Sequence, residues 1–228
     1  MASRPVFIPM RDGDYFVKKV DVAFDWVPGM ALSQARRRIE SLHAAVRRSL
    51  NLHSALEVSS KSPDALGVSL SAFNLTVRPR SGETMSVEAA YQGSKVFSSG
   101  GPFRDIYRMP PIDAKRDERL RTSGRIVGFD YFGQRWETFP KSAFYDWLYV
   151  SALAQDERLS ASLDRFECFT DIAFNPEKSF NCQARAVALH VSLRWRGLLE
   201  SALASQAAFL GVLGRVPTLD DGQPDLIG

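Results

Sequence analysis

Residues 86–97, SVEAAYQGSKVF, combine a carboxylic acid and an amine at a spacing that suits catalysis. In a helix, with about 100° between successive residues, Glu88, Gln92 and Lys95 lie within about 60° of one another. Small residues beside this polar stripe leave room for a ligand to approach closely. A carboxyl group and an amine seven residues apart, two helix turns along, can then both contact one ligand held between them. A surface helix with a solvated polar stripe fits the same spacing, so both interpretations remain open.

Residues 181–193, NCQARAVALHVSL, place an arginine in a segment that is otherwise largely apolar. From Ala184 onward the helical pattern is apolar on nearly every side, which predicts a buried helix. Burial of the Arg185 guanidinium is costly unless an anion meets it. That anion is either a structural carboxylate or a bound phosphate. Asn181 lies close to the first helix amides, which also favour negative charge.

Trp136 stands between a GQR segment and the helix that Pro140 is expected to open,. A tryptophan at this position either packs in the core or offers a flat wall to a base or a ribose. The position of its ring relative to a cavity separates the two interpretations.

The remaining patterns are mostly helical, with a few short extended segments. We predict strands near residues 20–26, 57–60 and 68–77, and a turn at 80–82,. We predict helices at residues 33–50, with Ser33 as the N-cap, and at 86–97, 113–120, 140–153, 181–195 and 198–213,. The expected fold class is therefore mainly α (α+β), a compact helical domain with a few short strands.

The pattern divides the chain into three parts. Residues 1–55 are expected to form an N-terminal extension, a strand followed by a basic helix, that packs on the main domain. Residues 56–214 are expected to form that main domain. Residues 215–228 contain two prolines and three aspartates, a composition typical of a mobile tail,.

The composition indicates a protein with a buried core and no membrane or metal signature. Hydrophobic residues make up 45% of the chain and charged residues 24%, as in globular proteins,. No apolar run reaches about 18 residues, and Pro9 closes a first apolar piece too short for a signal peptide, so a cytoplasmic protein is expected. Cys168 and Cys182 fit a reducing compartment as small core residues. Three histidines without zinc-type spacing argue against a zinc hydrolase, and neither metal nor cofactor is expected,.

Taken in order, the central segments resemble the NADAR (YbiA-like) family. The core pattern of that family is F-S-N-F, a short turn, and then S-E-x-x-[YF]-Q-x-x-K-F. The chain has LSAF at residues 70–73, SGET at 81–84 and SVEAAYQGSKVF at 86–97. Ala72 stands in place of the family's asparagine, and Asn74 is expected to take over its amide role.

Further segments resemble one branch of this family, which is associated with DarT-type toxins that ADP-ribosylate DNA on guanine. They are RPVFIP at residues 4–9, SLH at 41–43, FTDI at 169–172 and NCQAR at 181–185. Ala114-Lys115, Trp136 and residues 181–193 also follow in the family's order. The resemblance spans about residues 1–205, and the order of the segments makes it more specific than any single motif.

The resemblance implies a NADAR-like catalytic domain in residues 56–214 that acts as an ADP-ribosyl N-glycosidase. Such an enzyme removes ADP-ribose from guanine bases in DNA and serves as antitoxin to a DarT-type toxin. Its partner is ADP-ribosylated DNA, its product is ADP-ribose, and the toxin is a genetic rather than a physical partner. The alternatives are an N-glycosidase of small riboflavin-pathway intermediates, or a non-catalytic protein that binds ADP-ribose or neutralises the toxin by contact.

The residues and the resemblance together suggest a mechanism. Glu88 is expected to move protons, and Lys95 to attack the opened ribose and form an imine that water hydrolyses. This route needs some neutral lysine, so burial must lower the pKa of Lys95. In a rival scheme Lys95 only neutralises a phosphate while Glu88 activates water. The expected ADP-ribose contacts are Ser71, Asn74, Gln92, Trp136, Asn181 and Arg185.

A basic segment after the predicted catalytic helix is expected to contact DNA. Its candidate phosphate contacts are Lys115, Arg116, Arg119, Arg121 and Arg125. The formal net charge of +3 permits contact with nucleic acid without requiring it,. The guanine must leave the base stack or lie in a single strand, and unstacking costs about a few kcal/mol.

Overall fold

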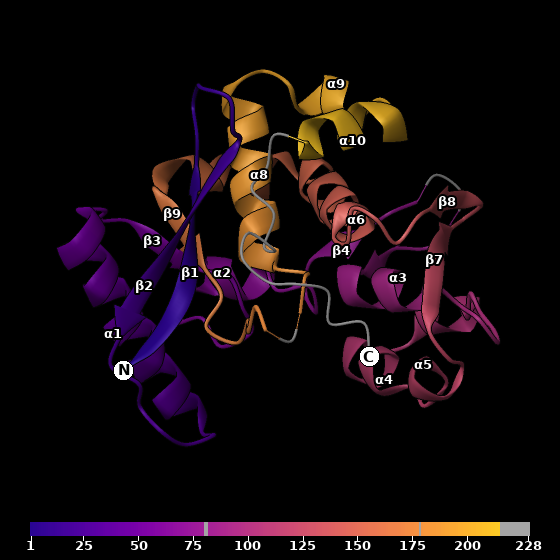
Figure 1. Cartoon of the computed structure of the whole chain (residues 1–228), viewed down its shortest axis with the longest axis horizontal. Coiled ribbons are helices and arrows are strands. Elements are labelled where there is room, and N and C mark those ends of the chain that lie inside the picture. The colour runs from indigo at the N-terminus through magenta and orange to yellow at the C-terminus, as the bar shows by residue number, and fades with distance from the viewer. Residues whose placement is uncertain (80–81, 178, 215–228) are drawn as a thin grey trace.

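Two helices that are apolar on nearly every side, α6 (Ala143–Ala154) and α8 (Gln183–Trp195), pack against each other near the centre of the molecule (Figure 1). Both contribute many side chains to the main hydrophobic core, among them the fully buried Phe144, Tyr149 and Val187. The predicted burial of the second helix is therefore confirmed.

The computed structural model describes residues 1–79, 82–177 and 179–214. The other helices are α1 (Leu32–Leu50), α2 (Ala65–Ser69), α3 (Val87–Gly93), α4 (Pro111–Arg116), α5 (Arg119–Thr122), α7 (Glu157–Ser162), α9 (Leu199–Leu203) and α10 (Gln206–Leu213), with the 3-10 turns η1 (Arg104–Arg108) and η2 (Leu163–Arg165). The strands are β1 (Ala2–Pro9), β2 (Val17–Phe24), β3 (Ala55–Glu57), β4 (Thr76–Val77), β5 (Met85–Ser86), β6 (Lys95–Phe97), β7 (Ile126–Tyr131), β8 (Gln134–Trp136) and β9 (Cys168–Thr170). This is an α+β fold with small sheets, so the predicted fold class is confirmed.

The first two strands belong to a four-stranded sheet of order β2-β1-β9-β3. β1 pairs antiparallel with both β2 and β9, whereas β3 pairs parallel with β9. Helix α1 packs on this sheet, because Ile39, Leu42 and Val46 are buried in one cluster with strand residues. The segment predicted as an extension thus shares a sheet with a strand from late in the chain. A domain boundary at residue 55 stays a prediction.

The prediction of one helix over residues 86–97 is wrong at its C-terminal end. Helix α3 ends at Gly93, and β6 follows, pairing antiparallel with β7 in a sheet of order β6-β7-β8. A Cβ on Gly93 would lie 2.5 Å from the Tyr107 ring, so only glycine allows η1 to pack this closely. The β-branched and aromatic residues of β6 then pair across the sheet, which outweighs the helical pattern.

Two other elements differ because local caps interrupt the predicted segment. Residues 68–77 were predicted as extended, but α2 enters this segment after its N-cap Asp64 accepts a hydrogen bond from the Leu66 amide at 2.8 Å. Residues 198–213 hold two helices, and Ser205 caps the second by accepting from the Ala208 amide.

Further boundaries also shift. Helix α1 begins after Ala31 without a side-chain cap, so Ser33 is not its N-cap. Helix α6 begins at Ala143, three residues after Pro140, which was expected to open it. The predicted helix over residues 113–120 instead spans parts of α4 and α5. Cys168 and Cys182 are free and buried, as predicted. None of the described helices combines the length and apolar character needed to cross a bilayer. The predicted mobile tail, residues 215–228, and most of the predicted turn at 80–82 lie outside the described residues.

Candidate active site

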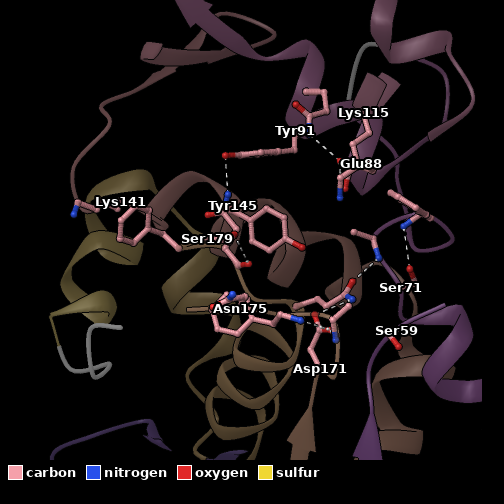
Figure 2. Close-up of a pocket in the computed structure, with 18 of the residues that line it drawn as sticks. Ser59, Ser71, Glu88, Tyr91, Lys115, Lys141, Tyr145, Asp171, Asn175 and Ser179 are labelled. Carbon is pink, nitrogen blue, oxygen red and sulfur yellow. Dashed lines mark hydrogen bonds and ion pairs between the residues drawn. The ribbon is translucent and has the colours of Figure 1, made fainter. Parts of the chain in front are cut away.

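A cavity of about 950 Å³ lies against α3, α6 and the segment that leads into α8 (Figure 2). Its volume is at the upper end of the range of about 300–1,000 Å³ found for small-molecule sites. The predicted site residues that line it are Ser71, Glu88, Gln92, Lys95, Lys115 and Asn181. The structure therefore brings the two predicted catalytic side chains to one cavity, although they come from different elements.

The cavity lining carries more cations than anions among the described residues. Its lysines are Lys61, Lys95, Lys115 and Lys141, and its carboxylates are Glu88 and Asp171. Such an excess of positive charge favours an anionic ligand, for example a diphosphate. In the described part of the chain, no group of three or more histidine, cysteine, aspartate or glutamate side chains is arranged to hold a metal ion.

Glu88 lies in the first turn of α3, with 6% of its surface exposed. Its Oε1 accepts a hydrogen bond from Gln92 Nε2 at 2.8 Å, and Lys115 Nζ lies 3.9 Å from the same oxygen. Ser86 fixes the start of this helix, because its hydroxyl accepts from the Ala89 amide at 3.1 Å. Glu88 is thus held between an amide and a cation at the cavity wall.

Lys95 reaches the cavity from the first position of β6. Its Nζ lies 4.8 Å from the centre of the Tyr91 ring. Burial lowers the pKa of Lys95 to about 8; the charge of Glu88 opposes this shift, and the charge of Lys115 adds to it. At pH 7 such an amine is neutral in about one molecule in ten, against fewer than about one in a thousand for an ordinary lysine. The nucleophilic form of Lys95 is therefore well populated.

Two tyrosines complete the wall beside this lysine. Tyr91 Oη accepts a hydrogen bond from Asn181 Nδ2 at 2.7 Å (Figure 2). The rings of Tyr91 and Tyr145 meet edge-on, with their centroids 5.3 Å apart. Burial raises the pKa of both phenols, so both stay neutral. Asn181 thereby joins the segment before α8 to α3 at the cavity.

Asp171 was not predicted, and it provides a second carboxylate, separated from Glu88 in Figure 2. Its Oδ2 accepts from Gln183 Nε2 at 3.1 Å, and Gln183 Oε1 accepts from the Ala72 amide at 2.9 Å. Burial raises the pKa of Asp171. The segment FTDI carries this residue, so its place in the family resemblance was the signal that could have identified it. Lys61 lies in no such motif.

Arg185, predicted to hold a pyrophosphate, lies in the core instead. The residue is 4% exposed, and its guanidinium forms an ion pair with Asp146 and donates a hydrogen bond to Ser142. It is not among the described residues that line the cavity. Of the two anions left open by the sequence, the geometry favours the structural carboxylate.

Breaking this buried ion pair should destabilise the fold strongly. Asp146→Ala is expected to lower the free energy of unfolding by about 3–5 kcal/mol, because Arg185 would stay charged and unpaired in the core. Urea unfolding followed by circular dichroism measures this change. Asp164→Ala, which breaks a more exposed pair with Arg194, should cost at most about 1 kcal/mol,. Equal stability of the two variants would contradict the assigned core role.

Trp136 and Asn74 are also absent from the described lining of the cavity. Trp136 is buried and packs against Phe144 and Trp147, so the core interpretation fits it. Asn74 is exposed, and its Nδ2 donates back to the carbonyl oxygen of Val68 at 2.8 Å. Neither side chain is placed to contact a ligand inside the cavity.

The predicted DNA-contact segment divides into three environments. Lys115 lines the cavity beside Glu88. Arg119 forms ion pairs with Asp105 and Asp117. The remaining members, Arg116, Arg121 and Arg125, are exposed and accessible to phosphates.

Comparison with known proteins identifies one family. A model of the family described as DarT1-associated NADAR antitoxin matches residues 2–221. The matched residues include all strands of the four-stranded sheet β2-β1-β9-β3 and every described residue that lines the cavity. No curated protein matches the chain.

Proposed function

This chain belongs to the family of DarT1-associated NADAR antitoxins, and we propose that it is an ADP-ribosyl N-glycosidase that removes ADP-ribose from guanine bases in DNA. One observation supports this activity most directly. A lysine with a lowered pKa and a buried carboxylate, Lys95 and Glu88, line one cavity in which lysines outnumber carboxylates among the residues that the structure describes. This combination offers a nucleophile, a proton donor and a site for a diphosphate.

The bond to be broken joins C1 of the ribose to the exocyclic amine of guanine. Opening of the ribose ring turns its ring oxygen into a hydroxyl and leaves C1 double-bonded to the guanine nitrogen. The neutral amine of Lys95 adds to C1, and Glu88 carries the two protons of this amine, one after the other, to the guanine nitrogen. The bond between C1 and that nitrogen then breaks, guanine leaves with its amino group restored, and an imine remains between C1 and Lys95. Water then adds to the imine, which releases Lys95 and an aldehyde that closes to ADP-ribose.

Two buried acceptors support binding of the sugar. Gln92 Oε1 and Asn181 Oδ1 lie on residues that line the cavity, and they have no hydrogen-bond partner among the described residues. An unpaired buried acceptor costs about 1–3 kcal/mol, so ribose hydroxyls that donate to these oxygens would be favoured. Because Lys61 is among the described residues that line the cavity and Arg185 is not, we assign to Lys61 the diphosphate contact that the sequence suggested for Arg185.

The pH dependence of the reaction should follow Lys95. Because the neutral amine attacks and its pKa is about 8, the single-turnover rate should rise about tenfold per pH unit below pH 8 and level off above it,. Rapid-quench assays on an ADP-ribosylated oligonucleotide, at a series of pH values on both sides of this pKa, measure the profile. A rate that falls as the pH rises through this range would contradict attack by Lys95.

The activity itself is tested by incubation with an oligonucleotide that carries one ADP-ribosylated guanine, followed by mass measurement. Release of ADP-ribose and restoration of guanine are expected. Preferred turnover of aminopyrimidine ribose phosphates would favour the small-molecule glycosidase. Full protection against the toxin by the double variant Glu88→Ala/Lys95→Ala would favour neutralisation by contact.

A further inference from the structure

Two phenylalanines that line the cavity hold much of their surface in solvent. Phe139 is 79% exposed and Phe180 41%, whereas Phe129 and Phe174, which line the same cavity, are buried. Removal of an aromatic ring from water lowers the free energy, and a ring that stays exposed does not contribute this stabilisation. Exposed rings gathered at a cavity therefore indicate a surface that a ligand covers.

The two rings come from separate loops, and a lysine lies beside one of them. Phe139 lies between β8 and α6, and Phe180 lies shortly before α8. Lys141, from the first loop, places its Nζ 4.1 Å from the centre of the Phe180 ring. Figure 2 shows Lys141 on the opposite side of the view from Glu88 and Lys115. We call Phe139, Lys141 and Phe180 the aromatic rim.

We propose that the aromatic rim stacks on nucleotides next to the modified guanine in single-stranded DNA, with Lys141 near a backbone phosphate. This inference rests on the proposed function. Aromatic rings combined with cations are the usual means by which proteins bind single strands, because every base has a π-face. A duplex keeps these faces stacked on one another, so an unpaired strand presents them at lower cost.

The position of the rim agrees with the geometry of the substrate. The exocyclic amine of guanine is attached to C2 of the six-membered ring, whereas the deoxyribose is attached to N9 of the five-membered ring. The DNA backbone is therefore separated from the reacting C1 by part of the base and by the exocyclic nitrogen. Lys141, the member of the rim labelled in Figure 2, lies apart from Glu88 in that view, which agrees with this requirement.

The adenine of ADP-ribose is the other base that the rings would suit. The interior of the cavity already offers polar partners for an enclosed group, including Ser71, Gln183 and Asn175. A ring as exposed as Phe139 suits instead the part of the substrate that continues outside the cavity. The flanking nucleotides are that part.

The test compares the double variant Phe139→Ala/Phe180→Ala with the wild-type protein on three substrates. They are a single-stranded oligonucleotide with one ADP-ribosylated guanine, the same strand with abasic sites on both sides of that guanine, and ADP-ribosylated deoxyguanosine. On the first, KM should rise between about fivefold and about a hundredfold per stacked base lost, with kcat little changed. On the other two, KM should stay the same, because no neighbouring base is present. The control Tyr15→Ala removes an exposed ring outside the described lining of the cavity and should behave like wild type.

Two results would overturn the aromatic rim as a DNA contact. One is an unchanged KM of the double variant on the intact strand. The other is an equal rise in KM on all three substrates, which would place the adenine of ADP-ribose on the rings. Failure of the proposed function looks different, because the wild-type protein would then release ADP-ribose from none of the three.

Discussion

Replacement of Lys95 by arginine is expected to lower the single-turnover rate by about a thousandfold or more, as loss of a nucleophile does in other enzymes. Arginine keeps the positive charge but stays protonated at neutral pH, so it cannot form the imine. The variant therefore separates the two roles considered for Lys95. If this lysine only neutralised a phosphate, the arginine variant would keep most of its activity.

Chemical trapping gives an independent measurement of the same step. Borohydride added during turnover should reduce the imine to a stable secondary amine, and peptide mass spectrometry should place the ADP-ribosyl adduct on Lys95. Lys18→Arg, a change at an exposed lysine of β2, should leave both turnover and trapping unchanged. Release of ADP-ribose without any adduct on wild-type Lys95 would exclude the imine route.

Glu88→Gln is expected to lower the single-turnover rate by about a hundredfold to ten-thousandfold, the contribution typical of a general acid–base group. Glutamine has nearly the same shape and can still accept the hydrogen bond from Gln92, but it cannot transfer a proton,. The charge of Glu88 raises the pKa of Lys95, so its removal should move the inflection of the pH profile below its wild-type position near 8. A lower pKa leaves more of Lys95 neutral. Low activity together with this shift would therefore show that the rate fell because proton transfer was lost, and not because Lys95 was protonated.

A matched carboxylate controls for the change of charge. Glu83→Gln alters an exposed side chain that pairs only weakly with the exposed Arg108, and it should leave the rate unchanged,. Thermal unfolding of both variants should show folded proteins. A Glu88→Gln variant that turns over at the wild-type rate, with a normal pH profile, would remove Glu88 from the mechanism.

Local patterns in the sequence were sufficient for the class of the fold and for much of the site. The spacing of apolar residues in α1 and α8 predicted helices in the right places. A helix buried on one face or on all faces shows this in the order of apolar and polar residues along its own segment,. Glu88 and Gln92 are four residues apart, a spacing that places two side chains on one face of a helix, and the structure joins them by a hydrogen bond. The family resemblance added the order of the segments and the antitoxin association.

Partners that lie far apart in the chain could not be inferred in this way. A carboxylate and a phosphate meet the needs of Arg185 equally well, and Asp146, 39 residues earlier, became the partner because α6 packs on α8. Lys95 lies on a strand because β7 pairs with it, yet it still reaches the cavity. Phe139 and Phe180 approach the same opening only after two separate loops have folded. Hydrophobic periodicity records how each segment meets the core, whereas the choice among possible partners depends on contacts between segments that periodicity does not encode.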